Sequence, residues 1–225
     1  KAKVITYGKD NTADWYPTDV TFNDLGHATY TVNHKGEKIA QVELSIPGMH
    51  NVYNSLSAFA LATCYGVATE AIVKGIKNFT GTDRRFQFKG QFNGVNVIDD
   101  YAHHPTEIQA TINSARGTKL NKLWIMFQPH TYTRTYNHLD DFAKVLSEAD
   151  HVILLDIYAS REKDTGLVSS KDLRDKIEAL GGVVTYCPTF NDAEKYAVDN
   201  CRKGDMLITM GAGDVYKIGE KLVSK

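Results

Sequence analysis

From about Arg85 to the end of the chain, short apolar runs alternate with segments of helical periodicity, and this alternation constrains the fold most strongly. The apolar runs predict strands at Val95–Ile98, Leu123–Phe127, Val152–Asp156, Val183–Cys187 and Met206–Met210. Strands that alternate with helices are typical of a parallel sheet covered on both faces. The sequence therefore predicts an α/β protein with a doubly wound, mostly parallel, Rossmann-like sheet in this half.

The first part of the chain has a different rhythm, with short apolar segments separated by turn residues. It predicts an antiparallel meander of four strands, at Val4–Tyr7, Asp19–Phe22, Ala28–Val32 and Ile39–Leu44. Pro47-Gly48 ends this pattern, and apolar residues at helical spacing then predict two helices before Gly81. A β-meander with two helices thus precedes the Rossmann-like half.

The composition excludes several classes of function. With 225 residues, 42% hydrophobic and 24% charged, the chain is typical of an ordered globular protein. A formal charge of -1 gives no electrostatic footprint for nucleic acid or an acidic membrane, and no apolar run approaches the ~18 residues of a membrane span. We therefore expect a small-molecule site. Three cysteines without a C-x-x-C pair predict reduced core thiols in a cytoplasmic protein.

Polar residues follow four of the five predicted parallel strands. These segments are Asp99–His104, Gln128–Arg134, Tyr158–Glu162 and Gly211–Asp214. Because the carboxyl ends of parallel strands meet at one edge, and open α/β sheets bind ligands there, the four segments predict a binding site.

Each segment also has a simpler interpretation. Asp99 and Asp100 either contact a ligand or cap the following helix, and the glycines at Gly211–Gly213 either hold a phosphate or allow tight packing. Adjacent His103 and His104 point to opposite sides of an extended chain, and no other Cys or His lies at zinc spacing. We therefore predict no metal ligands, although a metal-dependent phosphoesterase built on these Asp and His residues stays an alternative.

Two more groups in the first part and at the junction carry polar chemistry. His50, Asn51 and Asn54 fall within one helical turn, and an Asn side chain suits the edge of an adenine ring because it both donates and accepts. Asn51 alone is equally explained as a helix cap. Arg84 and Arg85 either hold phosphate or pair with surface carboxylates.

Five motifs in this order resemble the Mur ligase family over nearly the whole chain. They are G-x-H-N-x-x-N (Gly48–Asn54), F-x-G-x-x-R-R-F (Phe79–Phe86), D-D-Y-A-H-H-P-T-E (Asp99–Glu107), F-Q-P-H-x-Y-T-R-T (Phe127–Thr135) and G-A-G-D (Gly211–Asp214). The resemblance implies that residues 1–84 are the C-terminal part of a central ATP-binding domain. It implies that residues 85–225 are the family's C-terminal Rossmann-like domain.

Within the family, the chain is most similar to members that join L-alanine to UDP-N-acetylmuramate during peptidoglycan synthesis in the cytoplasm. The resemblance implies an acyl phosphate, made from the muramic acid carboxylate and ATP, which the amine of L-alanine then attacks. A ligase that adds a recycled tripeptide is the second choice, because it shares D-D-x-A-H-H-P but differs around Gln128-Pro129-His130. A non-catalytic nucleotide-binding module also stays open.

The resemblance implies roles for particular residues. It assigns ATP binding to five residues, His50, Asn51, Asn54, Arg85 and Asp100, with Asp100 on the ribose. It assigns the amino acid and the acyl phosphate to four residues, Tyr101, His103, His130 and Arg134. Arg85 and His103 are the expected catalytic residues, with Arg85 on the transferring phosphate and Arg134 on the alanine carboxylate. His103 or His130 relays the ammonium proton.

The sequence departs from the family in two respects. Thr131 follows His130 where family members carry Arg. The sequence also has no G-x-x-G-K-[ST] phosphate loop, since Asp10 follows Gly8-Lys9. We therefore expect a fragment that lacks the UDP-binding domain and most Mg²⁺ ligands, binds ATP weakly and does not catalyse ligation alone.

Overall fold

The computed structural model describes residues 4–224, which divide into two compact units. Unit 1 contains the residues up to Gly81 together with Gly117–Lys119, and unit 2 contains Thr82–Arg116 and the residues from Leu120 onward. Each unit encloses its own apolar core.

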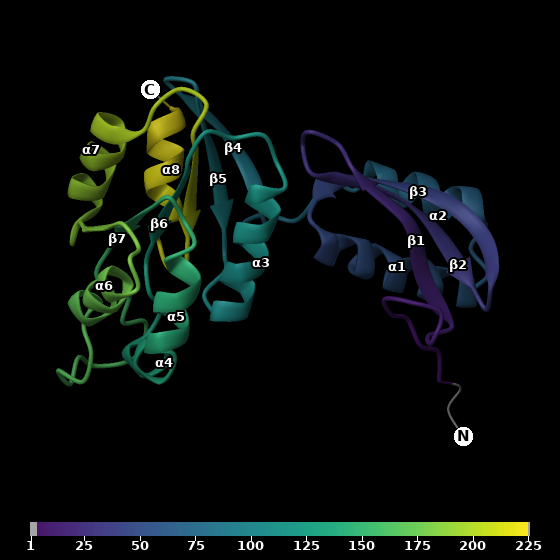
Figure 1. Ribbon diagram of the computed structural model, residues 1–225, viewed down its shortest axis with the longest axis horizontal. Coiled ribbons are helices and arrows are strands. Elements are labelled where there is room, and N and C mark those ends of the chain that lie inside the picture. The colour runs from purple at the N-terminus through teal and green to yellow at the C-terminus, as the bar shows by residue number, and fades with distance from the viewer. Residues whose placement is uncertain (1–3, 225) are drawn as a thin grey trace. The chain divides into compact units, whose positions relative to one another are not determined.

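Unit 1 is a three-stranded antiparallel sheet packed against two helices (Figure 1). The elements are β1 (Trp15–Phe22), β2 (His27–His34), β3 (Glu37–Pro47), α1 (Met49–Cys64) and α2 (Thr69–Asn78). The core joins Trp15, Tyr30 and Val42 of the sheet to Leu56 and Phe59 of α1, all nearly or fully buried. Burial of these side chains is the main stabilising contribution to the unit.

The meander differs from the prediction at its first strand. Val4–Tyr7 form no strand, and Tyr7 makes a single bridge to Trp15. Val4 is 80% exposed, so no core face fixes its register, whereas Trp15 is buried and stacks on His34. β1 begins at Trp15 despite Pro17, which is tolerated because β1 is an edge strand.

Unit 2 has the predicted α/β architecture, with six strands ordered β4-β5-β9-β6-β7-β8. The strands are β4 (Gln87–Phe92), β5 (Val95–Asp100), β6 (Leu123–Phe127), β7 (His151–Leu154), β8 (Val184–Tyr186) and β9 (Met206–Met210). All neighbouring pairs are parallel except β4 with β5. The mostly parallel, Rossmann-like sheet is thus confirmed.

Helices cover both faces of this sheet. They are α3 (Pro105–Arg116), α4 (Tyr132–Asn137), α5 (Leu139–Leu146), α6 (Ser170–Ala179), α7 (Phe190–Asn200) and α8 (Tyr216–Val223). One apolar cluster joins the sheet to α3, α5 and α6, and a second joins it to α7 and α8. The two clusters require alternate side chains of β5, β6 and β9 to point to opposite faces, and this explains why β6 is apolar throughout and β9 is apolar except at Thr209.

Hydrogen bonds at their first turns cap two of these helices. Ser169 and Asp172 form a capping box at α6, and at α7 the Thr189 side chain accepts from the Asp192 N–H. Glu194, also on α7, pairs with Lys221 of α8. Strand β4 was not predicted, although Asn93-Gly94, both at positive φ, form its turn to β5.

The three cysteines are free thiols in the structure. Cys187 and Cys201 are buried, as predicted for core thiols, whereas Cys64 is exposed at the end of α1, so the core prediction is wrong for it. Between residues 4 and 224, none of the helices combines the length and apolar character that crossing a membrane requires.

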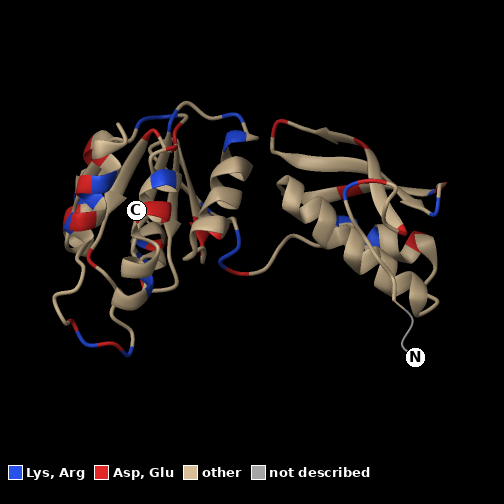
Figure 2. Cartoon of the chain, turned by 60° about the horizontal axis from the view of Figure 1, so that its bottom comes forward, with Lys and Arg blue, Asp and Glu red and all other residues tan. Residues whose placement is uncertain are grey.

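Basic and acidic residues are interspersed along the helices of unit 2 (Figure 2). On α6, for example, Lys171, Arg174 and Lys176 alternate with Asp172 and Asp175. A helix of this kind does not form the continuous basic surface that attracts a polyanion. Recognition of an anionic ligand therefore depends on individual side chains at the sheet edge.

Candidate active site at the carboxyl edge of the sheet

The segments that follow β5, β6, β7 and β9 meet at the carboxyl edge of the sheet, as predicted. The backbone N–H of Gly211 donates to Asp100 (3.1 Å), and that of Gln128 donates to Met210 (3.0 Å). His130 forms a parallel bridge with Tyr158. The loops that carry the predicted site residues of unit 2 are thus joined directly to one another.

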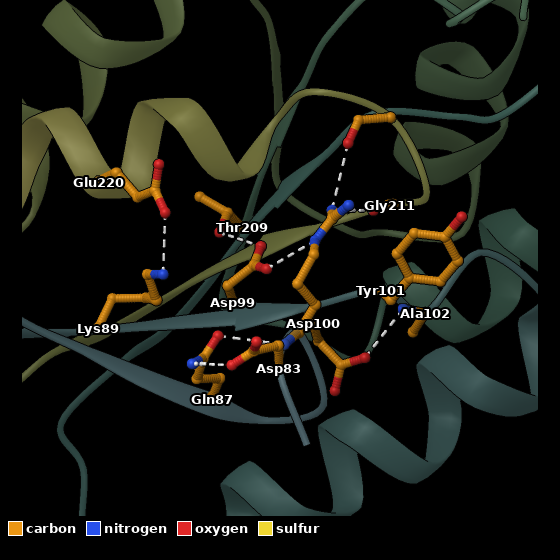
Figure 3. Close-up of polar contacts among 12 residues, drawn as sticks. Asp83, Gln87, Lys89, Asp99, Asp100, Tyr101, Ala102, Thr209, Gly211 and Glu220 are labelled. Carbon is orange, nitrogen blue, oxygen red and sulfur yellow. Dashed lines mark hydrogen bonds and ion pairs between the residues drawn. The ribbon is translucent and has the colours of Figure 1, made fainter. Parts of the chain in front are cut away.

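Arg84 lies at the centre of a buried cluster, drawn in Figure 3. Its Nε donates to Asp99 Oδ2 (2.9 Å), and its Nη2 donates to the carbonyls of Gly211 (2.8 Å) and Gly213 (3.2 Å). The guanidinium also lies between the rings of Tyr101 and Tyr216, 4.7 and 4.5 Å from their centroids. Arg84 therefore joins β5 to the loop that follows β9, and these contacts occupy its Nε and Nη2.

Asp99 is the anionic partner in this cluster. Its side chain is 1% exposed, and its Oδ1 accepts from Thr209 Oγ1 (2.8 Å) while Oδ2 accepts from Arg84. Asp99 lies within β5 and does not cap a helix. Both carboxylate oxygens are therefore bound within the fold, and the helix-cap interpretation of Asp99 is wrong.

Asp100 is also buried, with 5% of its surface exposed. Its carboxylate accepts from the N–H groups of Ala102 (2.8 Å) and Phe86 (3.1 Å) and from Thr111 Oγ1 (2.9 Å). Burial raises the pKa of Asp100, and the hydrogen bonds oppose that rise. A carboxylate has about four acceptor positions, so about one remains for the expected ribose contact.

Arg85 differs from its neighbour. Its side chain is 53% exposed, and its closest acidic partner is Glu107, 3.8 Å away. A solvated pair of this kind contributes little and is easily exchanged for a ligand. Of the two arginines, Arg85 is the one free to approach a phosphate.

His103 follows the extended end of β5 and begins the approach to α3. Its Nδ1 lies 2.9 Å from the carbonyl oxygen of Tyr101. Because a carbonyl only accepts, Nδ1 carries the proton, and Nε2 of the neutral ring has a free lone pair. The Glu107 carboxylate lies 3.4 Å from Nδ1 and also accepts from the His103 backbone N–H (3.0 Å).

His130 has the opposite arrangement. Its Nδ1 lies 3.0 Å from Nη1 of Arg134, and because a guanidinium only donates, Nδ1 accepts and Nε2 carries the proton. Burial and then the charge of Arg134 lower the pKa of His130. The His103 and His130 rings are 5.9 Å apart, so a base nitrogen and a donor nitrogen belong to neighbouring imidazoles.

Arg134 lies on α4, whose N-cap is Thr131. The Thr131 hydroxyl accepts from the Arg134 N–H (3.4 Å), and its φ of +67° is unusual for a β-branched residue. The position where family members carry Arg is therefore a strained helix cap here.

The predicted adenine residues belong to unit 1. His50, Asn51 and Asn54 lie in the first turns of α1, with Gly48 as N-cap. The Asn51 side chain donates to the Pro47 carbonyl (2.7 Å) and accepts from Asn54 Nδ2 (3.2 Å), so Asn51 is not the helix cap. Burial lowers the pKa of His50, which favours a neutral imidazole on this helix.

The alternative metal site is not assembled in unit 2. Asp99 and Asp100 are bound as described, and His104 contacts Thr106 Oγ1 (3.1 Å) and the His138 ring (4.7 Å). In the described part of the chain, no three His, Cys, Asp or Glu side chains are placed to hold a metal ion together.

The glycines of the last loop are explained by packing. A Cβ on Gly211 would lie 2.6 Å from the Gln128 carbonyl oxygen, and one on Gly213 would lie 2.6 Å from Gln128 Oε1 and 2.9 Å from Tyr158 Cγ. Gln128 lies in the F-Q-P-H motif and Tyr158 in a predicted site loop, but no sequence pattern indicates a particular role for either of them. The same holds for Tyr216, the first residue of α8.

Comparisons with known proteins agree with this geometry. Residues 84–213 match the family model of the Mur ligase glutamate ligase domain, and residues 1–62 match that of the Mur ligase middle domain. The chain belongs to the Mur ligase family.

Individual relatives show which members of the family this chain is similar to. The chain is 51% identical to a UDP-N-acetylmuramate--L-alanine ligase of Agathobacter rectalis, over 99% of this chain and 49% of that protein. The crystal structure of a Thermotoga maritima UDP-N-acetylmuramate-alanine ligase superposes with a TM-score of 0.83 at 26% identity, over 98% of this chain and 47% of that one. The crystal structure of a murein peptide ligase of Psychrobacter arcticus superposes with a TM-score of 0.67 at 27% identity, over 97% of this chain and 45% of that one. The chain spans about half the length of the curated relatives it matches.

Proposed function

We propose that this chain supplies the amino-acid site and part of the ATP site of an ATP-dependent ligase that joins L-alanine to UDP-N-acetylmuramate. The observation that carries the proposal is the pairing of a base nitrogen on His103 with the fixed His130–Arg134 donor pair. The names of relatives at 51% identity support the choice of substrates.

The reaction needs two displacements. A carboxylate oxygen of UDP-N-acetylmuramate attacks the γ-phosphorus of ATP, releasing ADP and leaving an acyl phosphate. The amine of L-alanine then attacks the acyl carbon, and inorganic phosphate leaves as the amide forms. Because L-alanine arrives as an ammonium, one proton must be removed before its nitrogen attacks.

The two histidines take different parts in this proposal. The free Nε2 lone pair makes His103 the acceptor of the ammonium proton, and the Nε2–H makes His130 a donor to a negative oxygen. Tyr101, whose ring is 5.4 Å from that of His103, forms one wall of the site. This division supports His103, rather than His130, as the base.

The arginines recognise the anions. Arg134, already held by His130, binds the alanine carboxylate through its remaining donors, and Arg85 binds the transferring phosphate. His50, Asn51 and Asn54 of unit 1 contact adenine, and Asp100 contributes its remaining acceptor position to the ribose. Residues 1–84 are then the C-terminal part of the central ATP-binding domain of the ligase, and residues 85–225 are its C-terminal domain.

Mg²⁺ accompanies ATP in this proposal and neutralises phosphate charge when bound. The described residues offer no cluster of acidic and imidazole side chains for it, so no step is assigned to a metal held by them. The three free thiols fit a cytoplasmic location, which is part of the same proposal.

The test joins this chain to the N-terminal half of a relative, which the match with this chain does not cover. This chain is fused after the N-terminal half of the A. rectalis ligase, and we call the product the hybrid ligase. The proposal predicts that ADP release over many turnovers requires both UDP-N-acetylmuramate and L-alanine, because L-alanine must consume each acyl phosphate before the next forms. ADP release with a tripeptide, but none with L-alanine, supports the recycling ligase instead.

A second measurement keeps the test decisive if the hybrid ligase does not fold. Titration of the 225-residue chain with millimolar L-alanine, followed by NMR, is expected to shift the imidazole resonances of His103 and His130. Arg134→Ala is expected to abolish these shifts. Shifts that survive in this variant contradict the assignment of the carboxylate to Arg134.

A further inference from the structure

The loop after β7 has no part in the chemistry proposed above, yet it contacts His130 and the helix that carries Arg134. The Tyr158 N–H donates to the Pro129 carbonyl (2.8 Å), and the Thr131 N–H donates to the Tyr158 carbonyl (2.9 Å). These bonds bracket His130 and fix its backbone on both sides.

The side chain of Tyr158 acts on the imidazole itself. Its ring stacks on His130, with 5.6 Å between centroids and 22° between planes. Tyr158 is 37% exposed, and its Cβ and Cγ lie against Gly213, where an added Cβ would approach to 2.9 Å. The Tyr158 ring is therefore placed between His130 and the loop that follows β9.

Glu162 acts on the helix that carries Arg134. Its Oε2 accepts from the Thr133 N–H (2.9 Å) at the first turn of α4, and this bond lowers the pKa of Glu162. A carboxylate at a helix N-terminus satisfies N–H groups that have no partner within the helix. The charge therefore holds the start of α4 against the loop after β7.

The backbone between the two contacts is strained. Thr131, at φ +67°, connects His130 to α4, and a β-branched residue keeps such a conformation only when its surroundings impose it. Tyr158 binds it from one side and Glu162 holds the helix on the other. Loss of either contact lets Thr131 relax and turns α4, which carries Arg134 away from His130.

We infer that Tyr158 and Glu162 are positioning residues that hold His130 and Arg134 in the geometry needed to bind the carboxylate of the amino-acid substrate. The inference deepens the proposed function and rests on it. Neither residue touches the reacting atoms, so their effect is transmitted through the orientation of the His130 ring and of α4.

The test uses two matched pairs of variants. Tyr158→Phe keeps the stacked ring and Tyr158→Ala removes it; Glu162→Gln keeps an acceptor for Thr133 and Glu162→Ala removes it. Both members of the second pair lose the charge, so their difference isolates the hydrogen bond. Glu178→Gln, on the exposed face of α6, is the control for a surface charge.

The first readout is the pKa of His130, measured by NMR in the 225-residue chain. The charged groups that act on His130 are Arg134, His103 and Glu162. Tyr158→Ala is expected to raise the pKa toward 6.5, because it exposes the ring and releases Arg134, whereas Tyr158→Phe leaves it unchanged. Glu162→Ala is expected to give His130 a higher pKa than Glu162→Gln does, because only the alanine variant loses the hydrogen bond that holds α4 and Arg134.

The second readout is the change in KM for L-alanine compared with the change in KM for ATP, both measured in the hybrid ligase. Both alanine variants are expected to raise KM for L-alanine about fivefold to tenfold, the effect of a lost helix cap, with KM for ATP unchanged. Equal changes in both KM values, or an unaltered pKa of His130 in both alanine variants, overturn the inference while leaving the proposed function intact. Absence of L-alanine-dependent ADP release in the unmodified hybrid ligase counts against the proposed function instead.

Discussion

Two groups of residues at the same sheet edge use their polar atoms in opposite ways. In the arginine cluster, Arg84 with Asp99, Asp100 and Thr209, the two carboxylates and Thr209 are buried, and the carboxylates take most of their hydrogen bonds from groups of the protein. The histidine cluster, His103, His130 and Arg134, is half-exposed, and each side chain makes one hydrogen bond that orients it and leaves other polar atoms free.

The difference separates the scaffold from the binding surface. Burying a charge is costly unless its partners are present, so the arginine cluster is stable only as a complete set. The side chains of the histidine cluster are half-exposed and remain partly hydrated. Their free donors and lone pairs are available to a ligand. Four experiments test this contrast, in order of expected effect.

The largest effect is expected from breaking the Arg84–Asp99 pair. Asp99→Ala leaves the guanidinium of Arg84 without its buried partner and should lower the free energy of unfolding of unit 2 by about 3 kcal/mol. Chemical denaturation of the 225-residue chain measures this loss. The double variant Arg84→Ala with Asp99→Ala should lose less than the sum of the two singles, and strict additivity would contradict the coupling.

Arg134→Ala should change stability little and substrate binding strongly. Because Arg134 is half-exposed, its loss should change the free energy of unfolding by less than about 1 kcal/mol. The same variant should raise KM for L-alanine in the hybrid ligase by about 10- to 100-fold, as expected for lost charged hydrogen bonds. An equal increase in KM for ATP would refute the assignment to the amino acid.

The slope of the unfolding free energy against pH has opposite signs for a histidine of one cluster and a carboxyl group of the other. The pKa of His130 is lowered in the folded state, so the unfolded state binds more protons and stability falls as pH drops from 6.5 through the folded pKa. The pKa of Asp100 is raised, so the folded state binds more protons and stability falls as pH rises from about 3.9 through the folded pKa.

Variants assign these slopes to residues. His130→Gln should flatten the curve of unfolding free energy against pH just below pH 6.5, and His104→Gln serves as the control. A slope in this window that is the same in His130→Gln as in the unmodified chain shows that His130 does not contribute to it.

The smallest effect is expected for a charged pair that lies near the arginine cluster but is exposed. Lys89 and Glu220 are 2.9 Å apart (Figure 3), and the Glu220 side chain is 47% exposed. Glu220→Gln should change the free energy of unfolding by less than about 1 kcal/mol. A loss as large as that of Asp99→Ala would show that burial is not what separates the two pairs.

The sequence predicted the positions of the site loops better than the partners of their side chains. Strands that alternate with helices placed Asp99, His130 and Gly211 at one edge, because parallel strands share a direction. The strand order was not predictable in this way, since β9 enters between β5 and β6 from the far end of the chain. That placement brings the Gly211 carbonyl to Arg84, more than a hundred residues earlier.

The choice between Arg84 and Arg85 shows the same limit. The two neighbours are equivalent by sequence, and only the buried Asp99 and the flanking rings of Tyr101 and Tyr216 distinguish them. Tyr158 and Glu162 were found in a loop at the correct edge, but stacking and helix capping are long-range contacts that no local pattern specifies. Strand β4 is different, because the Asn93-Gly94 pair that forms its turn to β5 is a local signal for a hairpin.

The dependence of ADP release on L-alanine, in a folded hybrid ligase that binds ATP and UDP-N-acetylmuramate, tests the account most directly. We predict that ADP release beyond one equivalent per enzyme occurs only when L-alanine is present, and that Arg134→Ala raises KM for L-alanine while thermal unfolding is unchanged. ADP release that does not respond to L-alanine, in a hybrid ligase shown to be folded and to bind both other substrates, would contradict the account.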